Sequence, residues 1–478
     1  MALAPQHPDV TPSSFYRRVR RWQIAFHCIL LLAVLVLGIW SYRRFLFFVV
    51  LIPIAFTPFS YARLRLQQDV EQALHAMRPT AALLPILTGL GLFFDAIMIA
   101  QALTARLGSP VPILQSPGIA WLGAIWYSAH VLLFVGYVLL DFARWSRRRL
   151  TRALQQWFSL PHEAPVSPER RQFLQQVGVL GAGAPFLLSL SGAKLTYDFR
   201  VEERELTLPH WPPALDGLRV AHLSDIHVGG AMNRDRLLRM AALTNNARPD
   251  LVVHTGDFLT HRRGDFDLPL YEALAQIRAP YGQWACLGNH DFDRPEQLVS
   301  RLREAGVITL RDTLTTLSLR GQSVEIGGID FPLRGLGIQA RSYTQIVQSL
   351  GPRGPLPRLL LIHDPRAFAT IPDGCADLVF SGHTHGGQVG IQLGQDHALT
   401  VVGLVGIPDQ GIFQRKDMMM FITRCVGFYG YPMRLGIPPE IALLTLRAPQ
   451  SQPSRTMPAS RWENHPPKSS VQDGAEET

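Results

Sequence analysis

The stretch Ser224-Asp225-Ile226-His227 and four short motifs that follow it in order decide the fold of this chain. The later motifs are Gly256-Asp257, Gly288-Asn289-His290-Asp291, His363 and Gly382-His383-Thr384-His385. Most of the five come directly after a short apolar run, such as Leu251 to Val253 or Leu378 to Phe380. An apolar run of this length predicts a buried strand, and ligands gather at the ends of such strands. Five strand-end loops that meet at one place would form a compact site.

The side chains in these motifs are those that bind transition metals, namely carboxylates, imidazoles and a side-chain amide. Between the motifs, the apolar spacing predicts helices over residues 234–245, 268–277 and 295–305. Strands that alternate with helices and end in candidate ligands indicate an α/β core. The sequence therefore predicts an α/β domain with a metal site at one edge.

The five blocks resemble the signature of the calcineurin-like metallophosphoesterase superfamily, which is D-x-H, G-D, G-N-H-[DE], H and G-H-x-H in that order. No ligand position is replaced, and the resemblance covers residues 215–447, about half of the chain. The closing segment, Arg424 to Gly430 followed by Pro438-Pro439-Glu440-Ile441, resembles the membrane-associated, often exported subgroup. The resemblance implies a sandwich of two mixed β-sheets flanked by helices.

The resemblance also implies two divalent metal ions bridged by Asp257. The first ion would be held in addition by Asp225, His227 and His385, and the second by Asn289, His363 and His383. Such mixed ligands suit Mn, Fe, Zn, Ni or Co better than a purely oxygen-liganded metal. In the family, a water activated by the metal ions is the nucleophile.

Two further residues have catalytic roles by the same resemblance. His290 is not a ligand and would protonate or stabilise the leaving oxygen, a role that suits an imidazole because its pKa lies near neutrality. Asp291 would orient His290 in a carboxylate–histidine pair.

The charge distribution argues against a nucleic-acid partner. Residues 1–193 hold 17 basic and 7 acidic side chains, whereas residues 194–447 hold 26 of each. The excess of the 46 Lys and Arg over the 37 Asp and Glu therefore lies in the apolar N-terminal part, where arginines set membrane topology. The few cysteines show no zinc-binding spacing, and a Cys375–Cys425 bridge stays open.

Residues 1–193 are predicted to be an all-α transmembrane region, because apolar runs of about 20 residues span a bilayer. Residues 194–447 would form the catalytic domain, and the Pro-rich residues 448–478 a disordered tail. About five spans are expected, at residues 23–40, 45–59, 80–103, 119–140 and 173–192.

Five spans with cytoplasmic arginines place everything after Gly192 on the outer side of the cytoplasmic membrane. The arginines before the first span, between the second and third, and between the fourth and fifth fit this topology. Arg170-Arg171, with the apolar stretch that follows, also resembles a twin-arginine export signal, and a plain fifth span is the alternative.

The function expected from these features is that of a membrane-anchored hydrolase of phosphodiester or pyrophosphate bonds. Its partners would be the lipid bilayer and a phosphorylated small molecule or lipid, such as an envelope lipid or a nucleotide-type substrate. One alternative is a UDP-2,3-diacylglucosamine-type pyrophosphatase of lipid A synthesis, which needs a cytoplasmic catalytic half. Another is a membrane sensor or transporter whose metal domain only binds a ligand.

Overall fold

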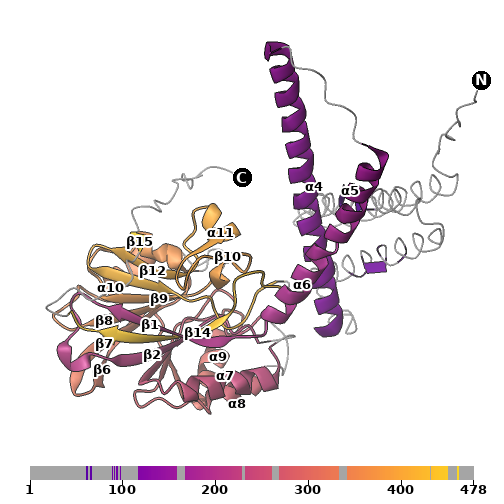
Figure 1. Cartoon of the computed structure of the whole chain (residues 1–478). Helices are drawn as coiled ribbons and strands as arrows, with labels where there is room; N and C mark the ends of the chain where they lie inside the picture. The colour runs from indigo at the N-terminus through magenta and orange to yellow at the C-terminus, as the bar shows by residue number, and fades with distance from the viewer. Residues whose placement is uncertain are drawn as a thin grey trace, which may run out of the picture. The chain divides into compact units, whose positions relative to one another are not determined.

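The computed structural model describes a C-terminal α/β part and several N-terminal helices (Figure 1). The chain divides into two compact units, residues 1–90 with 127–185 and residues 91–126 with 186–478. The described residues are 61–62, 65–66, 89, 91, 93–94, 97, 117–158, 167–228, 232–260, 268–332, 342–430, 432–449 and 460–461.

The first sheet of the second unit has six strands in the order β1-β14-β2-β3-β4-β5. Strands β2, β3, β4 and β5 are mutually parallel, and β14 joins β2 antiparallel and β1 parallel. Their bounds are β1 Arg200–Thr207, β2 Leu218–Leu223, β3 Leu251–His254, β4 Gln283–Ala285, β5 Val307–Thr309 and β14 Glu440–Arg447. Every residue of β3 is buried, as in a parallel sheet covered on both faces.

Three helices cover the outer face of this sheet, α7 (Arg234–Asn246), α8 (Leu268–Leu274) and α9 (Pro295–Glu304). They lie close to the predicted ranges. Helix α7 begins at Asn233, whose side chain accepts a hydrogen bond from the Arg236 amide and so caps the first turn. Apolar residues of the helices, such as Leu237, Leu274 and Leu302, pack with Ala221 and Val252 of the strands.

The second sheet has seven strands in the order β15-β12-β13-β9-β8-β7-β6. Its members are β6 Thr313–Leu319, β7 Gln322–Ile329, β8 Arg358–Ile362, β9 Leu378–Ser381, β12 Gly411–Arg415, β13 Met418–Ile422 and β15 Ser460–Arg461. Helix α10 (Tyr343–Ser349) packs Ile346 and Val347 on its outer face, against Leu360 and Val379. Because Ser460–Arg461 pairs with β12, the predicted disordered tail is not without structure throughout.

The two sheets share a single core. Leu218, Val220 and Val253 of the first sheet are buried with Leu359 and Phe380 of the second. The described part of the unit is thus layered helix, sheet, sheet, helix, with the strands of each sheet supplying alternate residues to the two sides. This arrangement confirms the predicted α/β sandwich of two mixed sheets flanked by helices.

The N-terminal helices that the structure describes are α4 (Pro117–Phe158), α5 (Pro168–Gly181) and α6 (Ala184–Leu195). Among the described residues, one helical segment is long and apolar enough to cross a membrane, at Trp121–Phe158 within α4. The predicted spans at 23–40 and 45–59, and nearly all of the one at 80–103, lie outside the described residues.

The predicted fifth span, residues 173–192, is divided between α5 and α6. The two helices are separated by a turn at Ala182-Gly183, and each has fewer residues than a bilayer crossing needs. No single helix therefore covers the range of the predicted fifth span, which stays a prediction. The C-terminal end of α6 instead packs into the second unit, where Ala193 is buried with Ala124 and Met433.

Candidate metal centre

Five loops at the carboxyl ends of parallel strands bring all the predicted ligand residues together. Strands β2, β3 and β4 of the first sheet lead into Asp225, Asp257 and Asn289, and β8 and β9 of the second lead into His363 and His383. The site therefore sits across the shared edge of both sheets. Most of its side chains are buried, because the two sheets and their loops enclose it.

A first group of side chains gathers around Asp225 and Asp257. His227 Nε2 lies 3.7 Å from Asp225 Oδ1 and 3.6 Å from Asp257 Oδ2. His385 Nε2 lies 3.3 Å from the same Asp225 Oδ1. One atom of each of Asp225, His227 and Asp257 falls within 4.8 Å of the others, which is close enough to hold one metal ion.

A second group shares Asp257 with the first. His363 Nε2 lies 3.3 Å from Asp257 Oδ2, 3.0 Å from Asn289 Oδ1 and 3.0 Å from His383 Nδ1. Asp257, His363 and His383 also satisfy the distances for one ion. The other ring nitrogen of His363, Nδ1, is 2.6 Å from the carbonyl oxygen of Thr255, which fixes the ring orientation.

Several of these residues have a left-handed backbone conformation, which residues other than glycine rarely adopt. Asp225, His227, Asp257, His383 and His385 have φ between 50° and 67°. Such conformations cost of order 1–3 kcal/mol each and persist where the surrounding structure enforces them, typically at functional sites. The surrounding structure therefore holds these loops in strained conformations that bring the five side chains to the site.

Glycines within the motifs allow the loops to approach closely. A Cβ on Gly382 would collide with Ser224 Oγ and Asp225 Oδ2, and one on Gly288 would collide with Asp257 Oδ1. These glycines leave the two carboxylates room at the junction of the strands.

Several buried polar atoms of the first group have no hydrogen-bond partner. Asp225 Oδ1, both ring nitrogens of His227 and Nδ1 of His385 are buried in this way. Buried polar atoms are normally paired, so a group of unpaired carboxylate and imidazole atoms fits a cation held among them. The other oxygen, Asp225 Oδ2, is held by the His383 amide at 2.9 Å and by Ser224 Oγ at 2.5 Å.

The field at the second group also favours a cation. Burial alone would lower the pKa of His363, but the Asp257 and Asp225 carboxylates raise it to about 10. The pocket thus stabilises positive charge at the point where His363 Nε2, Asn289 and His383 converge. Divalent metal ions match both this charge and the donor types.

His290 lies at the rim of the two groups and is not one of their donors. Its backbone amide donates to Asp257 Oδ1 at 2.8 Å, and its ring centroid is 5.2 Å from that of His227. Burial lowers the pKa of His290 below its ordinary value, although Asp257 raises it in part. His290 is half-buried, and its exposed part can reach a substrate.

Asp291 does not pair with His290, and that expectation was wrong. Its Oδ2 accepts hydrogen bonds from the amides of Asp257 and Gly288, and its Oδ1 from those of Phe258 and Leu259. The carboxylate is buried and ties the second motif to the third. Its position is set by main-chain donors, which a sequence pattern does not reveal.

Known proteins match the part of the chain that forms this site. The sequence profile described as "Calcineurin-like phosphoesterase" matches residues 218–387, which include all five motifs. The uncharacterised metallophosphoesterase YkuE of Bacillus subtilis is 30% identical over 292 residues, which are 58% of this chain and 98% of that protein. This chain belongs to the calcineurin-like phosphoesterase family. It is a metal-dependent phosphoric ester hydrolase.

Two other relatives of this calcineurin-like phosphoesterase have more informative names. A transmembrane protein with metallophosphoesterase domain from Danio rerio is 29% identical over 52% of this chain and 57% of its own length. The UDP-2,3-diacylglucosamine pyrophosphatase LpxG of Chlamydia muridarum is 25% identical over 48% of this chain and 84% of its own length.

Two aromatic rings of the phosphoesterase border the site and were not singled out from the sequence. The Tyr429 ring lies 4.6 Å from that of His290 and 5.5 Å from that of His227, and its side chain is about half-exposed. Phe331 lies 6.2 Å from the His363 ring and 6.0 Å from the His383 ring. No spacing rule marks such residues, because they come from loops outside the motifs.

The segment after β13, residues 423–430, contacts the Asp225 side of the site. Cys425 Sγ lies 3.1 Å from Asp225 Oδ2, and burial raises the pKa of its thiol well above the ordinary value. Cys286, Cys375 and Cys425 are free, so the Cys375–Cys425 bridge left open by the sequence is not formed. Arg424 donates to Glu440 at 2.6 Å, and Arg204 of β1 donates to the same carboxylate at 2.8 Å.

Proposed function

We propose that this phosphoesterase hydrolyses phosphodiester or pyrophosphate bonds with two divalent ions held around Asp257. Asp225, His227 and His385 would complete one ion site, and Asn289, His363 and His383 the other. The observation that carries the proposal is the pair of donor groups on either side of one carboxylate, with Asp257 Oδ2 3.6 Å from His227 and 3.3 Å from His363. Bound there, divalent ions would lower the pKa of a water and neutralise phosphoryl charge.

The chain's own groups would orient the substrate and assist the leaving oxygen. His290 stands at the rim, and burial, by lowering its pKa, favours the neutral ring, whose N–H would donate to that oxygen. Tyr429 lies next to His290 and His227, and Phe331 lies next to His363 and His383. Asp291 would act as a positioning residue, since it accepts hydrogen bonds from four main-chain amides in and directly after the second and third motifs.

We further propose that the site works at a membrane surface, on the outer side of the cytoplasmic membrane. Helix α4 carries exposed apolar side chains at Val138, Leu139 and Phe142, followed by arginines from Arg144 to Arg152. From Trp121 to Arg144 a helix rises about 35 Å, slightly more than a bilayer core of about 30 Å. Arginines mark the cytoplasmic end, so Trp121 would lie at the outer one.

The position of the catalytic part supports that side. Ala124 near the start of α4 packs with Ala193 of α6 and with Met433 of the catalytic part. The catalytic part is thus packed on the first residues of α4, which belong to the same unit. We propose residues 194–447 as the catalytic domain and the preceding helices as its anchor, with a phosphorylated lipid as substrate.

The alternative is a UDP-2,3-diacylglucosamine-type pyrophosphatase with a cytoplasmic catalytic half. It is favoured by the 25% identity to LpxG of Chlamydia muridarum. Reporters fused after Thr478 separate the outer from the cytoplasmic location. Alkaline phosphatase is active only on the outer side. A fluorescent protein that is exported unfolded does not mature, so fluorescence marks a cytoplasmic C-terminus. Fluorescence without phosphatase activity would reject the outer location.

Activity is tested with the full-length protein in detergent with Mn²⁺ supplied. Hydrolysis of bis(4-nitrophenyl) phosphate is compared with that of 4-nitrophenyl phosphate, with Asp257→Asn as the blank. We expect diester hydrolysis that is lost in the variant. Hydrolysis of the monoester alone would contradict the proposed diester and pyrophosphate specificity.

A further inference from the structure

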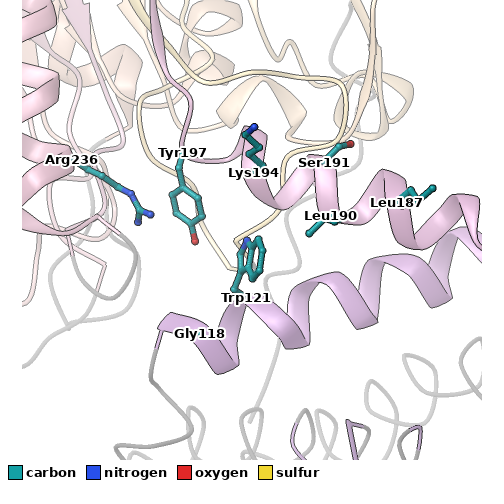
Figure 2. Close-up of a pocket in the computed structure, with 8 residues that line it drawn as sticks. All are labelled: Gly118, Trp121, Leu187, Leu190, Ser191, Lys194, Tyr197 and Arg236. Carbon is teal, nitrogen blue, oxygen red and sulfur yellow. The ribbon is translucent and has the colours of Figure 1, made fainter. Parts of the chain in front are cut away.

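A groove opens in the second unit beside helix α6, apart from the metal centre. Its volume is about 810 Å³, within the range of ligand pockets. Figure 2 shows Trp121 at the start of α4, Leu187 and Leu190 along α6, and Lys194, Tyr197 and Arg236 at one end. None of these residues belongs to the five motifs.

The wall of the groove is mainly apolar and its end is cationic. Leu187 and Leu190 are 69% and 44% exposed, which is unusual for leucines of a helix that is packed at its other end. Lys194 is exposed in the last turn of α6, and the Arg236 guanidinium lies 3.7 Å from the centre of the Tyr197 ring. The neighbouring Asp198 is paired with Arg200 and Arg239.

The cationic end is connected to the metal centre by ring contacts. The Tyr197 ring lies 6.0 Å from that of Phe428, and the next residue, Tyr429, lies 4.6 Å from His290. The Gly192 carbonyl of α6 also accepts a hydrogen bond of 3.3 Å from the Arg434 amide. A molecule in the groove would thus touch Tyr197, which contacts the segment that borders the metal centre.

We propose that the groove binds an acyl chain of an anionic, phosphate-bearing lipid. The leucines and Trp121 would contact the hydrocarbon, and Lys194 with Arg236 would face the phosphate. An amphiphile of this kind matches an apolar wall that ends in two cations, whereas a free anion would leave the leucines exposed. This inference rests on the proposed function, to which it adds the place where the lipid binds and the charge of its headgroup.

The groove would present a lipid from the outer leaflet to the metal centre. Trp121 begins the segment of α4 that is apolar enough to span a membrane, and Trp is favoured at the membrane interface. A lipid there needs no transfer through water to reach Tyr429. A place at the membrane interface and contact with a bound lipid would also explain why the leucines of α6 stay exposed.

Binding is tested on full-length protein in detergent micelles by quenching of Trp121 fluorescence, taken as wild type minus Trp121→Phe. The quenchers are phosphatidylglycerol and phosphatidylcholine with brominated acyl chains. We expect phosphatidylglycerol to quench at an about fivefold lower mole fraction, and Lys194→Gln to remove that preference. Lys416→Gln, which changes an exposed lysine of the β12–β13 turn, should keep it.

Equal quenching by both lipids would overturn the proposal, because it would mean that Trp121 is merely immersed in the micelle. Reversal of the quenching by inorganic phosphate would also overturn it, since the cationic end would then bind the free anion. The measurement is repeated in Asp257→Asn, whose binding should be unchanged. Binding without any ester hydrolysis would reject the proposed function alone, and hydrolysis without binding would reject the groove alone.

A second pair of variants tests the link to catalysis. Leu190→Trp fills the groove, whereas Leu188→Trp changes an exposed leucine of the same helix that does not line it. The ratio of kcat/KM for a phosphatidylglycerol substrate to that for bis(4-nitrophenyl) phosphate should fall about tenfold or more in Leu190→Trp. An equal ratio in both variants would contradict the proposed role.

Discussion

The fully buried guanidinium of Arg434 donates a hydrogen bond of 3.0 Å to the main-chain oxygen of His385. It also donates to the oxygens of Arg424 at 2.7 Å and Gly427 at 2.6 Å. One side chain thus joins the last ligand loop to the segment that carries Cys425 and Tyr429. Burial lowers the pKa of Arg434 to about 10, which still leaves it charged at neutral pH.

Replacement of Arg434 should destabilise the protein and loosen the His385 loop. Arg434→Met leaves three buried carbonyls without a donor, and we expect a loss of about 3 kcal/mol or more. Arg434→Lys should lose less, because it keeps the charge and one or two of the bonds. Thermal unfolding in detergent measures the effect. Arg239→Lys is the control, since this arginine also donates to two carbonyls but is exposed. A loss of stability in Arg239→Lys equal to that in Arg434→Lys would contradict the account.

Glu440 should make the free energy of unfolding depend on pH in the acidic range. Although burial raises its pKa, Arg204 and Arg424 lower it from 4.5 to about 2. Because the folded value is below the unfolded one, the stabilisation is complete above pH 4.5 and is lost as the pH falls towards 2. It amounts to about 3 kcal/mol, an order-of-magnitude figure for a wholly buried group.

The measurement is the difference in thermal midpoint between wild type and Glu440→Gln from pH 7 to pH 3. We expect a constant difference above about pH 5 and a shrinking one below it. Glu205→Gln removes an exposed partner of Arg447 and should change little at any pH. A Glu440 difference that grows in acid would show that the sign is wrong.

His290 should affect the chemical step without affecting metal content. His290→Asn removes the group at the rim but none of the two donor groups, so we expect kcat to fall about a hundredfold or more. Metal content by mass spectrometry should stay at the wild-type value, whereas His363→Ala should lower it. Loss of metal in His290→Asn would mean that this histidine is a ligand.

Gly382→Ala should weaken metal binding through crowding alone. The added methyl group would meet Asp225 Oδ2 and also Ser224 Oγ, which donates a hydrogen bond to that oxygen. Displacement of groups that orient a ligand typically costs about tenfold or more in metal affinity. Gly354→Ala adds a methyl group where the structure leaves open space. If a competitive chelator titration gave equal affinities for the two variants, crowding at Asp225 would be excluded.

The sequence predicted the sandwich and the gathering of the motifs because both depend on local signals. Apolar runs such as Leu251 to Val253 become fully buried strands, and the residue after each strand arrives at the sheet edge. The helix ranges were also close, since both α7 and α9 have amphipathic spacing, α7 is capped by Asn233 and α9 begins at Pro295. These features require no knowledge of distant contacts.

The sequence could not reveal contacts made across long separations. Arg434, Tyr429 and Phe331 reach the site from loops whose paths depend on the whole fold. Asp291 was assigned to His290 because they are neighbours in the chain, yet its oxygens face main-chain amides more than 30 residues away. The turn at Ala182-Gly183 was missed because hydropathy alone does not show where a helix stops.

The central claim is that Asp257 joins two metal sites, and metal stoichiometry tests it most directly. Full-length protein loaded with Mn²⁺ is freed of unbound metal, and the metal per chain is measured by mass spectrometry. The account predicts two ions per chain in wild type, one in His363→Ala, and one or none in Asp257→Asn. A wild type that holds a single ion, or Asp257→Asn that keeps two, would contradict it.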